Sequence, residues 1–300
     1  MKRIALIVGA LVGAAAIIGG VVISWQRISP QFKAIAINDA LYVPSLTETQ
    51  KQMVAAESAE LQTLLDTFSK RYPGQFGIVV TDLTTGATAS VGGQEQMVAA
   101  SLYKMFVAYG IYKKVDAGQL KLTSKTTGHN LNVGQCMEIM IVVSDNDCGY
   151  YLGRMVGWAA LDADLAKLGL TQTKVNNYIS ATSGNVNSDK LTSAADVAKF
   201  TELFYRGKLL SASSTKSLMN TMKAVKLNTW LPSGLPKGAV IAHKTGALYN
   251  LVHDAGIVTT VNGDYLIVVM SRNWQNASKQ PPPVFADISR QLWNYFSPKQ

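Results

Sequence analysis

Between residues 46 and 114, the spacing of apolar positions predicts a helix, a hairpin and a second helix. Apolar residues recur at near-helical spacing over 47–71 and then stop at a Tyr-Pro-Gly sequence. Apolar and β-branched residues fill 75–83 and return in 87–91 after a Thr-Thr-Gly turn signal, which predicts two paired strands. The helical spacing resumes at Ser101 and continues to about Lys114.

The second half of the chain repeats both patterns. Helical spacing predicts helices at 133–143, at 148–155 and after the three prolines that end at Pro283. Strand-like composition marks 239–243, 251–261 and 264–272, the last two joined by Asn262-Gly263, a strong hairpin turn. With 48% apolar residues among 300, the chain has enough apolar surface for a large core.

The N-terminal segment has the length and flanks of a membrane span. Ile4–Ser24 is uncharged over 21 residues, which as a helix spans roughly 30 Å of hydrocarbon. No small-x-small cleavage site follows it, Lys2 and Arg3 favour an N-terminus inside the cell, and Trp25 suits the membrane interface. The segment therefore favours an uncleaved anchor over two alternatives, a cleaved secretory signal and a buried core helix.

This interpretation divides the chain into an anchor at 1–25, a linker at 26–45 without sustained helical spacing, and a domain at 46–300. We expect a single-pass protein of the cell membrane, with the domain outside the cytoplasm. Signal cleavage would instead make it a secreted or periplasmic protein.

The net charge of +9 does not indicate nucleic-acid binding, because the lysines and arginines are scattered. The chain has no arginine-rich tract and no basic stretch interleaved with aromatic residues. An anionic polymer or lipid of the cell envelope is a better counter-charge for an exported chain, and a solvated basic surface is the simplest interpretation.

Ser101 and Lys104 lie one helical turn apart, so they share a helix face. A serine hydroxyl becomes a nucleophile only when a neighbouring base takes its proton, and an amine beside it can do so. Ser101 also falls in the first turn of its predicted helix, where free amides favour an anion and its own amide can form half of an oxyanion hole. Ser213 and Lys216 have the same spacing at a polar helix start, so the pair alone is weak evidence.

Two further triplets carry polar side chains suited to the same chemistry. Ser144-Asp145-Asn146 lies between two predicted helices, and alone it would be an ordinary helix cap. Lys244-Thr245-Gly246 lies in a predicted strand, and alone it would be an edge-strand lysine before a turn. Gly246 leaves room for another backbone or a ligand to approach.

In this order the three motifs resemble the signature set of the penicillin-recognising serine enzymes, and they are most similar to those of class A β-lactamases. The resemblance covers about 46–300. It implies an α+β fold, with an antiparallel sheet of about five strands flanked by helices and a mostly helical subdomain at approximately 100–235. The active site would lie between these two parts.

The resemblance also implies a role for each residue in an acyl transfer. Ser101 would be the acylated nucleophile, Lys104 its base, and Ser144 the group that passes a proton to the leaving nitrogen. Lys104 can act as a base only if burial and the nearby Lys244 lower its pKa.

Substrate binding would fall to the residues around the same site. Asn146 would bind the substrate amide, and Lys244 and Thr245 would hold its carboxylate beside Gly246. The Ala247 amide would complete the oxyanion hole.

The sequence departs from the class A pattern where a glutamate should activate the deacylating water. No glutamate occurs between Glu138 and Glu202, and Asn176 or Asn177 falls near the expected position. An amide is not a general base. Three aspartates are candidate replacements: Asp162, Asp164 and Asp189.

Two other departures concern the shape of the cleft. The family often adds an arginine that grips the substrate carboxylate, and none occurs in 207–271. The separation of Ser101 from Ser144 is also shorter than is usual, which predicts an open cleft that suits a peptide as well as a lactam.

Cys136 and Cys148 flank the second motif, and the only two cysteines of an exported chain usually pair. Two buried free thiols are the alternative. His129, His243 and His253 have no metal-ligand spacing, so we expect no metal and no cofactor, with His243 and His253 as hydrogen-bonded strand residues.

The leading expectation is a monomeric extracytoplasmic serine hydrolase that forms an acyl-enzyme at Ser101 with β-lactams and hydrolyses it, slowly if no carboxylate replaces the glutamate. One alternative is a penicillin-binding D,D-peptidase that acts on D-alanyl-D-alanine cell-wall peptides. Another is a binding or sensing module without turnover, but such a module need not keep both a nucleophile and its base.

Overall fold

Five antiparallel strands form the central sheet, in the order β4-β3-β9-β8-β7. Their bounds are β3 Gln75–Asp82, β4 Thr88–Val91, β7 Val240–Leu248, β8 Leu251–Thr260 and β9 Gly263–Arg272. The computed structural model describes residues 36–37, 40–41, 46–72, 74–176 and 190–297. The sheet joins β3 and β4, from the N-terminal half of the chain, to β7, β8 and β9, from the C-terminal half, and β9 is its central strand.

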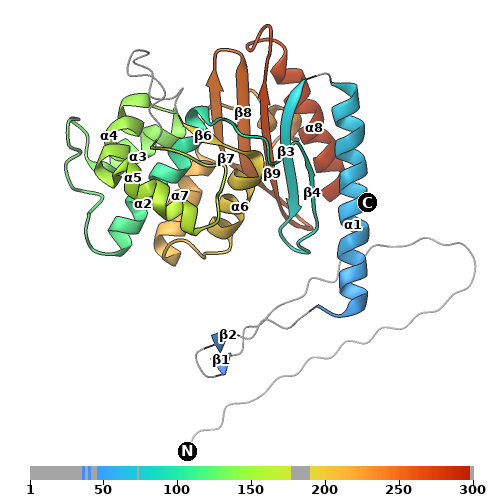
Figure 1. The fold of residues 1–300 in the computed structure, drawn as a ribbon, viewed down its shortest axis with the longest axis horizontal. Helices are drawn as coiled ribbons and strands as arrows, with labels where there is room; N and C mark the ends of the chain where they lie inside the picture. Colours follow the sequence, from blue (N-terminus) through green and yellow to red (C-terminus); the bar gives the residue numbers. More distant parts are fainter. Residues whose placement is uncertain (1–35, 38–39, 42–45, 73, 177–189, 298–300) are drawn as a thin grey trace, which may run out of the picture. The chain divides into compact units, whose positions relative to one another are not determined.

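Helices α1 (Glu48–Arg71) and α8 (Pro281–Phe296) cover one face of this sheet (Figure 1). Thr47 caps α1: its hydroxyl accepts from the Gln50 amide at 3.2 Å, and the Gln50 side chain accepts from the Thr47 amide at 2.9 Å. Apolar side chains at helical spacing on both helices, such as Leu65 and Ile288, share one core with the sheet.

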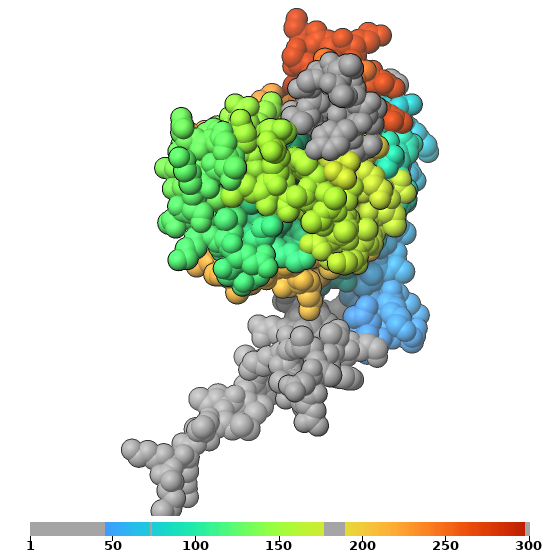
Figure 2. Space-filling model, turned by 60° about the vertical axis from the view of Figure 1, so that its left-hand side comes forward, coloured from blue at the N-terminus to red at the C-terminus, as the bar shows by residue number. Residues whose placement is uncertain are grey.

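The remaining helices lie on the other side (Figure 1). They are α2 Tyr103–Asp116, α3 Val133–Val142, α4 Asn146–Val156, α5 Trp158–Lys167, α6 Ala194–Tyr205 and α7 Ala212–Lys223. Figure 2 turns this side forward, and green and yellow-green atoms make up most of the face that it shows. A second apolar core joins these helices to the inner face of the sheet.

Short elements complete the description. β5 (Met97–Val98) pairs with β6 (Leu191–Thr192), and single helical turns occur at η1 (Ala100–Leu102) and η2 (Leu231–Gly234). Near the N-terminus, β1 (Ala36–Ile37) pairs with β2 (Ala40–Leu41).

The predicted α+β class and its sheet of about five antiparallel strands are confirmed. Asn146 is an exception to the predicted positions, because it is the first residue of α4 and not part of a loop. The predicted anchor at 1–25 lies outside the described residues, as does most of the linker at 26–45. Among the described residues, no helix combines the length and the apolar content needed to cross a bilayer.

Candidate active site

Ser101 lies in η1, directly before α2. Its neighbour Ala100 has φ 44°, a left-handed conformation that costs a residue with a side chain of order 1–3 kcal/mol. Such a conformation persists only where its surroundings hold it. Ser101 is 8% exposed, so most of this residue is shielded from solvent.

Lys104 is fully buried, and three oxygen atoms surround its amine. The amine donates to the Ser144 carbonyl at 2.6 Å, to the Ser144 hydroxyl at 3.2 Å and to Oδ1 of Asn146 at 2.7 Å. The first and second motifs, 40 residues apart in the chain, are therefore in direct contact.

The loop between α3 and α4 presents Ser144 in an unusual backbone conformation, with φ 61°. Asp145 follows as the N-cap of α4, and its carboxylate accepts from the Cys148 amide at 2.8 Å. The middle residue of the triplet thus has the capping role that the sequence alone suggested, while the residues on each side of it contact Lys104.

Lys244, in β7, reaches the same hydroxyl from the sheet. Its amine donates to Oγ of Ser144 at 2.9 Å and to the Thr245 carbonyl at 2.8 Å. Because the two lone pairs of this oxygen face two amines, the Ser144 hydroxyl hydrogen is free to point elsewhere and donate. A lysine, a serine and a second lysine thus form one connected chain.

Burial changes the acidity of both lysines. Desolvation lowers the pKa of Lys104 to about 7, against a weaker upward effect of the Asp145 carboxylate. Desolvation, and then the charge of Lys104, lower the pKa of Lys244 to about 7, while Asp254 acts in the opposite direction. Burial therefore gives Lys104 the lowered pKa that a neutral base near pH 7 needs, while the expected effect between the two lysines acts on Lys244.

Gly246 lies against the backbone of the nucleophile. A Cβ atom at this position would be 3.2 Å from the Ser101 amide nitrogen and 3.3 Å from the Ala99 carbonyl oxygen. The missing side chain is thus what lets β7 approach Ser101 closely. Thr245 before it is buried, and Ala247 after it is exposed.

The carboxylates proposed to replace the glutamate have other partners. Asp162 accepts from the Val175 amide at 2.6 Å, and Asp164 binds the amines of Lys113 and Lys167. Asn176 is exposed to solvent. Asn177 and Asp189 lie outside the described residues.

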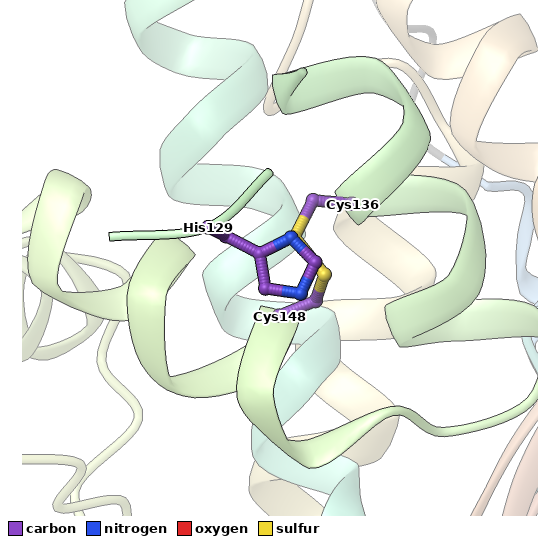
Figure 3. Close-up of side chains that lie close together, drawn as sticks. All are labelled: His129, Cys136 and Cys148. Atoms are coloured by element: carbon purple, nitrogen blue, oxygen red, sulfur yellow. A yellow bond between two sulfur atoms is a disulfide. The ribbon is translucent and has the colours of Figure 1, made fainter. Parts of the chain in front are cut away.

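Cys136, in α3, and Cys148, in α4, form a disulfide that joins the helices on either side of Ser144. Figure 3 shows the imidazole of His129 beside the two sulfur atoms, and the potential ligand atoms of the three side chains lie within 4.8 Å of one another. The sulfurs are bonded to each other, so they do not offer the thiolates that a metal requires. His129 also uses Nδ1 to accept from the Leu131 amide at 3.1 Å.

The two strand histidines are buried and hydrogen-bonded. Nδ1 of His243 lies 2.8 Å from Asp254, and Nε2 of His253 lies 2.8 Å from the Val98 carbonyl. The contact of His253 with the segment before Ser101 was not predictable from the sequence, because the two are distant in the chain and meet only in the folded sheet.

Comparison with known proteins places the chain in a family. The model of the Beta-lactamase enzyme family matches residues 58–296. A curated β-lactamase of Kitasatospora aureofaciens is 26% identical over 222 residues, which cover 65% of this chain and 71% of that protein.

Solved structures show the same fold. A leucine-to-glutamate mutant of PBP-A, in an acyl-enzyme complex with penicillin G, superimposes with a TM-score of 0.68 at 27% identity, over 81% of this chain and 96% of that one. A β-lactamase of Chitinophaga pinensis gives a TM-score of 0.69 at 22% identity, over 83% and 99% of the two chains.

Proposed function

The chain belongs to the beta-lactamase enzyme family, and on that premise we propose that it is a serine hydrolase acylated at Ser101. The observation that carries the proposal is the hydrogen-bonded chain of Lys104, Ser144 and Lys244 next to this serine. An acyl transfer needs a nucleophile, a base, a proton donor and an oxyanion site, and each has a candidate here.

In the proposed reaction, neutral Lys104 takes the proton of Ser101 as its oxygen attacks the substrate carbonyl. The amides of Ser101 and Ala247 stabilise the resulting oxyanion. The Ser144 hydroxyl then protonates the leaving nitrogen as the carbon–nitrogen bond breaks, and Lys104 returns its proton to Ser144. Lys244 and Thr245 hold the substrate carboxylate beside Gly246, while Asn146 binds the substrate amide.

β-Lactams are the substrates that we propose first, because the family match spans the whole domain. A D-alanyl-D-alanine peptide offers the same carbonyl, leaving nitrogen and carboxylate. The absence of a glutamate between Glu138 and Glu202, where Asn176 or Asn177 falls near the expected position, favours this second substrate. Without a base for water activation, an enzyme loses about 10²–10⁴-fold in deacylation of its β-lactam ester and is inhibited by β-lactams.

Intact mass spectrometry after mixing with benzylpenicillin tests the proposal. We expect one adduct per chain, which the Ser101→Ala variant does not form. Ser213→Ala is the matched control, because Ser213 has the same spacing to a lysine but lies in α7, where its hydroxyl bonds that of Ser211. An adduct that survives Ser101→Ala would refute the assignment. Binding without any covalent adduct would favour the sensing module.

We also propose that 1–25 anchor the enzyme in the cell membrane with the domain outside the cytoplasm. The uncharged length of Ile4–Ser24 and the preceding Lys2 and Arg3 support this location. N-terminal sequencing of membrane-extracted protein should begin at Met1 or Lys2. A start near residue 25–30 would indicate a cleaved signal instead.

A further inference from the structure

The segment that carries the nucleophile crosses the strands of the sheet. Met97 comes close to Gly77 in β3, because its terminal methyl would lie 3.6 Å from a Cβ atom at that glycine. The Val98 carbonyl is hydrogen-bonded to the His253 side chain of β8, and the Ser101 amide lies close to Gly246 of β7. The position of Ser101 along this path thus depends on where the segment is fixed to the strands beneath it.

The hydrogen bond between His253 of β8 and Val98 has a defined donor. The Ser271 amide donates to Nδ1 at 3.1 Å, so the imidazole hydrogen is on Nε2 and is donated to the Val98 carbonyl at 2.8 Å. The ring is fully buried and connects two strands of the sheet to the segment before the nucleophile.

The register of the sheet aligns this contact with the catalytic strand. His253 in β8 is directly opposite Gly246 in β7. In this pair of neighbouring residues, the side chain of His253 binds Val98, and the absence of a side chain at Gly246 leaves room for Ser101. A shift of Val98 on the sheet would move the Ser101 amide relative to β7.

The backbone between Val98 and Ser101 contains a strained residue. Ala100 has the left-handed φ of 44°, and a strained residue holds its conformation only when its flanks are fixed. On the N-terminal side, the Ala99 amide donates to the Lys190 carbonyl at 2.7 Å, and the Val98 carbonyl accepts from His253. Among the described residues, removal of the second bond leaves this side with the Ala99–Lys190 bond, the β5–β6 pairing and the contact of Met97 with β3.

We propose that His253 is a positioning residue for the acylation of Ser101: its Nε2–H fixes Val98, and thereby sets the Ser101 amide at its distance from Ala247 in the oxyanion hole. This inference rests on the proposed function. It predicts a loss in the acylation step and not in initial binding, because the contacts for the substrate carboxylate lie on β7 and do not involve Val98.

Two conservative variants separate positioning from simple stability. In His253→Gln the amide nitrogen reaches about as far as Nε2 and can donate to Val98. In His253→Asn the shorter side chain can accept from Ser271 but does not reach Val98. Stopped-flow mixing with a chromogenic β-lactam gives the dissociation constant of the initial complex and the acylation rate constant for each.

We expect His253→Asn to acylate roughly 10- to 100-fold more slowly with an unchanged dissociation constant, as a misplaced reacting group does. His253→Gln should remain within about threefold of the wild type. His243→Asn is the control, because His243 is equally buried but bonds Asp254. This control should lower the melting temperature and keep the acylation rate.

Two results would overturn the inference: acylation in His253→Asn at the wild-type rate, or equal losses in the Asn and Gln variants. Hydrogen exchange of peptides covering 97–102 provides a readout without substrate. Faster exchange in His253→Asn than in His253→Gln supports positioning, and equal exchange contradicts it. If the wild type forms no adduct at Ser101, the proposed function fails, and hydrogen exchange alone decides whether His253 fixes the segment.

Discussion

The amine of Lys244 donates to the hydroxyl oxygen of Ser144 at 2.9 Å, across 100 residues of sequence. The same oxygen accepts from Lys104, so each lysine is electrostatically sensitive to the protonation of the other. Two amines that share one hydroxyl in a buried site make the reaction dependent on pH near neutrality.

We predict that acylation by benzylpenicillin at low substrate concentration increases with pH up to about 7 and then falls, because Lys244, whose pKa is also about 7, loses the charge that holds the substrate carboxylate. Burial lowers the pKa of Lys104 to about 7, so the amine is protonated and inactive as a base below this pH and neutral above it. Rate constants from stopped-flow measurements between pH 5.5 and 8.5 would check the profile. A rate independent of pH over this range would mean that Lys104 is not the base.

The same lysines should make unfolding depend on pH. Their pKa values in the folded state, about 7, are below the ordinary lysine value of 10.5. Between about pH 7 and pH 10.5 the unfolded chain therefore binds more protons, and the free energy of unfolding should rise with pH in this window. Urea unfolding at pH 7.5 and pH 9 would show it, and Lys104→Met should reduce the difference.

Gly246→Ala should impair acylation while the protein still folds. The new methyl group would lie 3.2 Å from the Ser101 amide nitrogen and 3.3 Å from the Ala99 carbonyl, both backbone atoms that cannot rotate away. The resulting displacement of β7 from the nucleophile should slow acylation by roughly tenfold or more. A variant that acylates within twofold of the wild type would show that the two backbones have room to separate.

The wild type should give a stoichiometric burst with β-lactams and then a slow phase, because no glutamate is available to activate water. Asn176→Glu should accelerate the slow phase if the new carboxylate reaches the Ser101 ester. Steady-state assays with adduct detection by mass would follow both phases.

Asp162→Asn is the matched control for deacylation. Asp162 holds the Val175 amide, one residue before Asn176, so its replacement should loosen this segment without a change in acylation. Rapid turnover in the wild type would contradict the slow phase, and its loss in Asp162→Asn would show that Asp162 or the segment that it holds contributes to deacylation.

Cys136→Ala/Cys148→Ala should lower the free energy of unfolding by about 3 kcal/mol, the chain-entropy estimate for a loop of this size (sequence separation 12). The disulfide joins α3 to α4 on either side of Ser144, so acylation should also slow. Urea unfolding of the variant and of the oxidised wild type would measure the loss. Alkylation of both thiols in the unreduced wild type would contradict the pairing.

Local sequence patterns predicted α1 to α4, β3, β4, β8 and β9 to within about two residues, because turns and apolar spacing act over short distances, but they did not predict α5 or α6. The turn at Asn262-Gly263, which joins β8 to β9, is an example. The three motifs also predicted which residues would meet at the site. The central position of β9 was not predictable in this way, because strand order depends on contacts between distant segments.

Other features of the site were outside the reach of sequence patterns. The left-handed conformations of Ala100 and Ser144 leave no trace in composition, because neither residue type favours them. Asn146 is helical because Asp145 caps α4. From the sequence, a cap in this triplet and a catalytic role were alternatives, but the structure contains both the cap at Asp145 and the contacts of Ser144 and Asn146 with Lys104. The contact of His253 with Val98 joins residues 155 positions apart, and only the folded sheet brings them together.

The crossing of the sheet by residues 97–101 has an evolutionary consequence. A nucleophile on a surface loop can be changed by substitutions that leave the core alone. The segment that carries this one lies close to Gly77 of β3 and Gly246 of β7 and is hydrogen-bonded to His253 of β8. Substitutions that alter strand spacing or twist will change the catalytic rate along with the melting temperature. Selection for a new substrate in this scaffold should therefore proceed through exposed residues around the site, while the strands beneath the nucleophile remain nearly invariant.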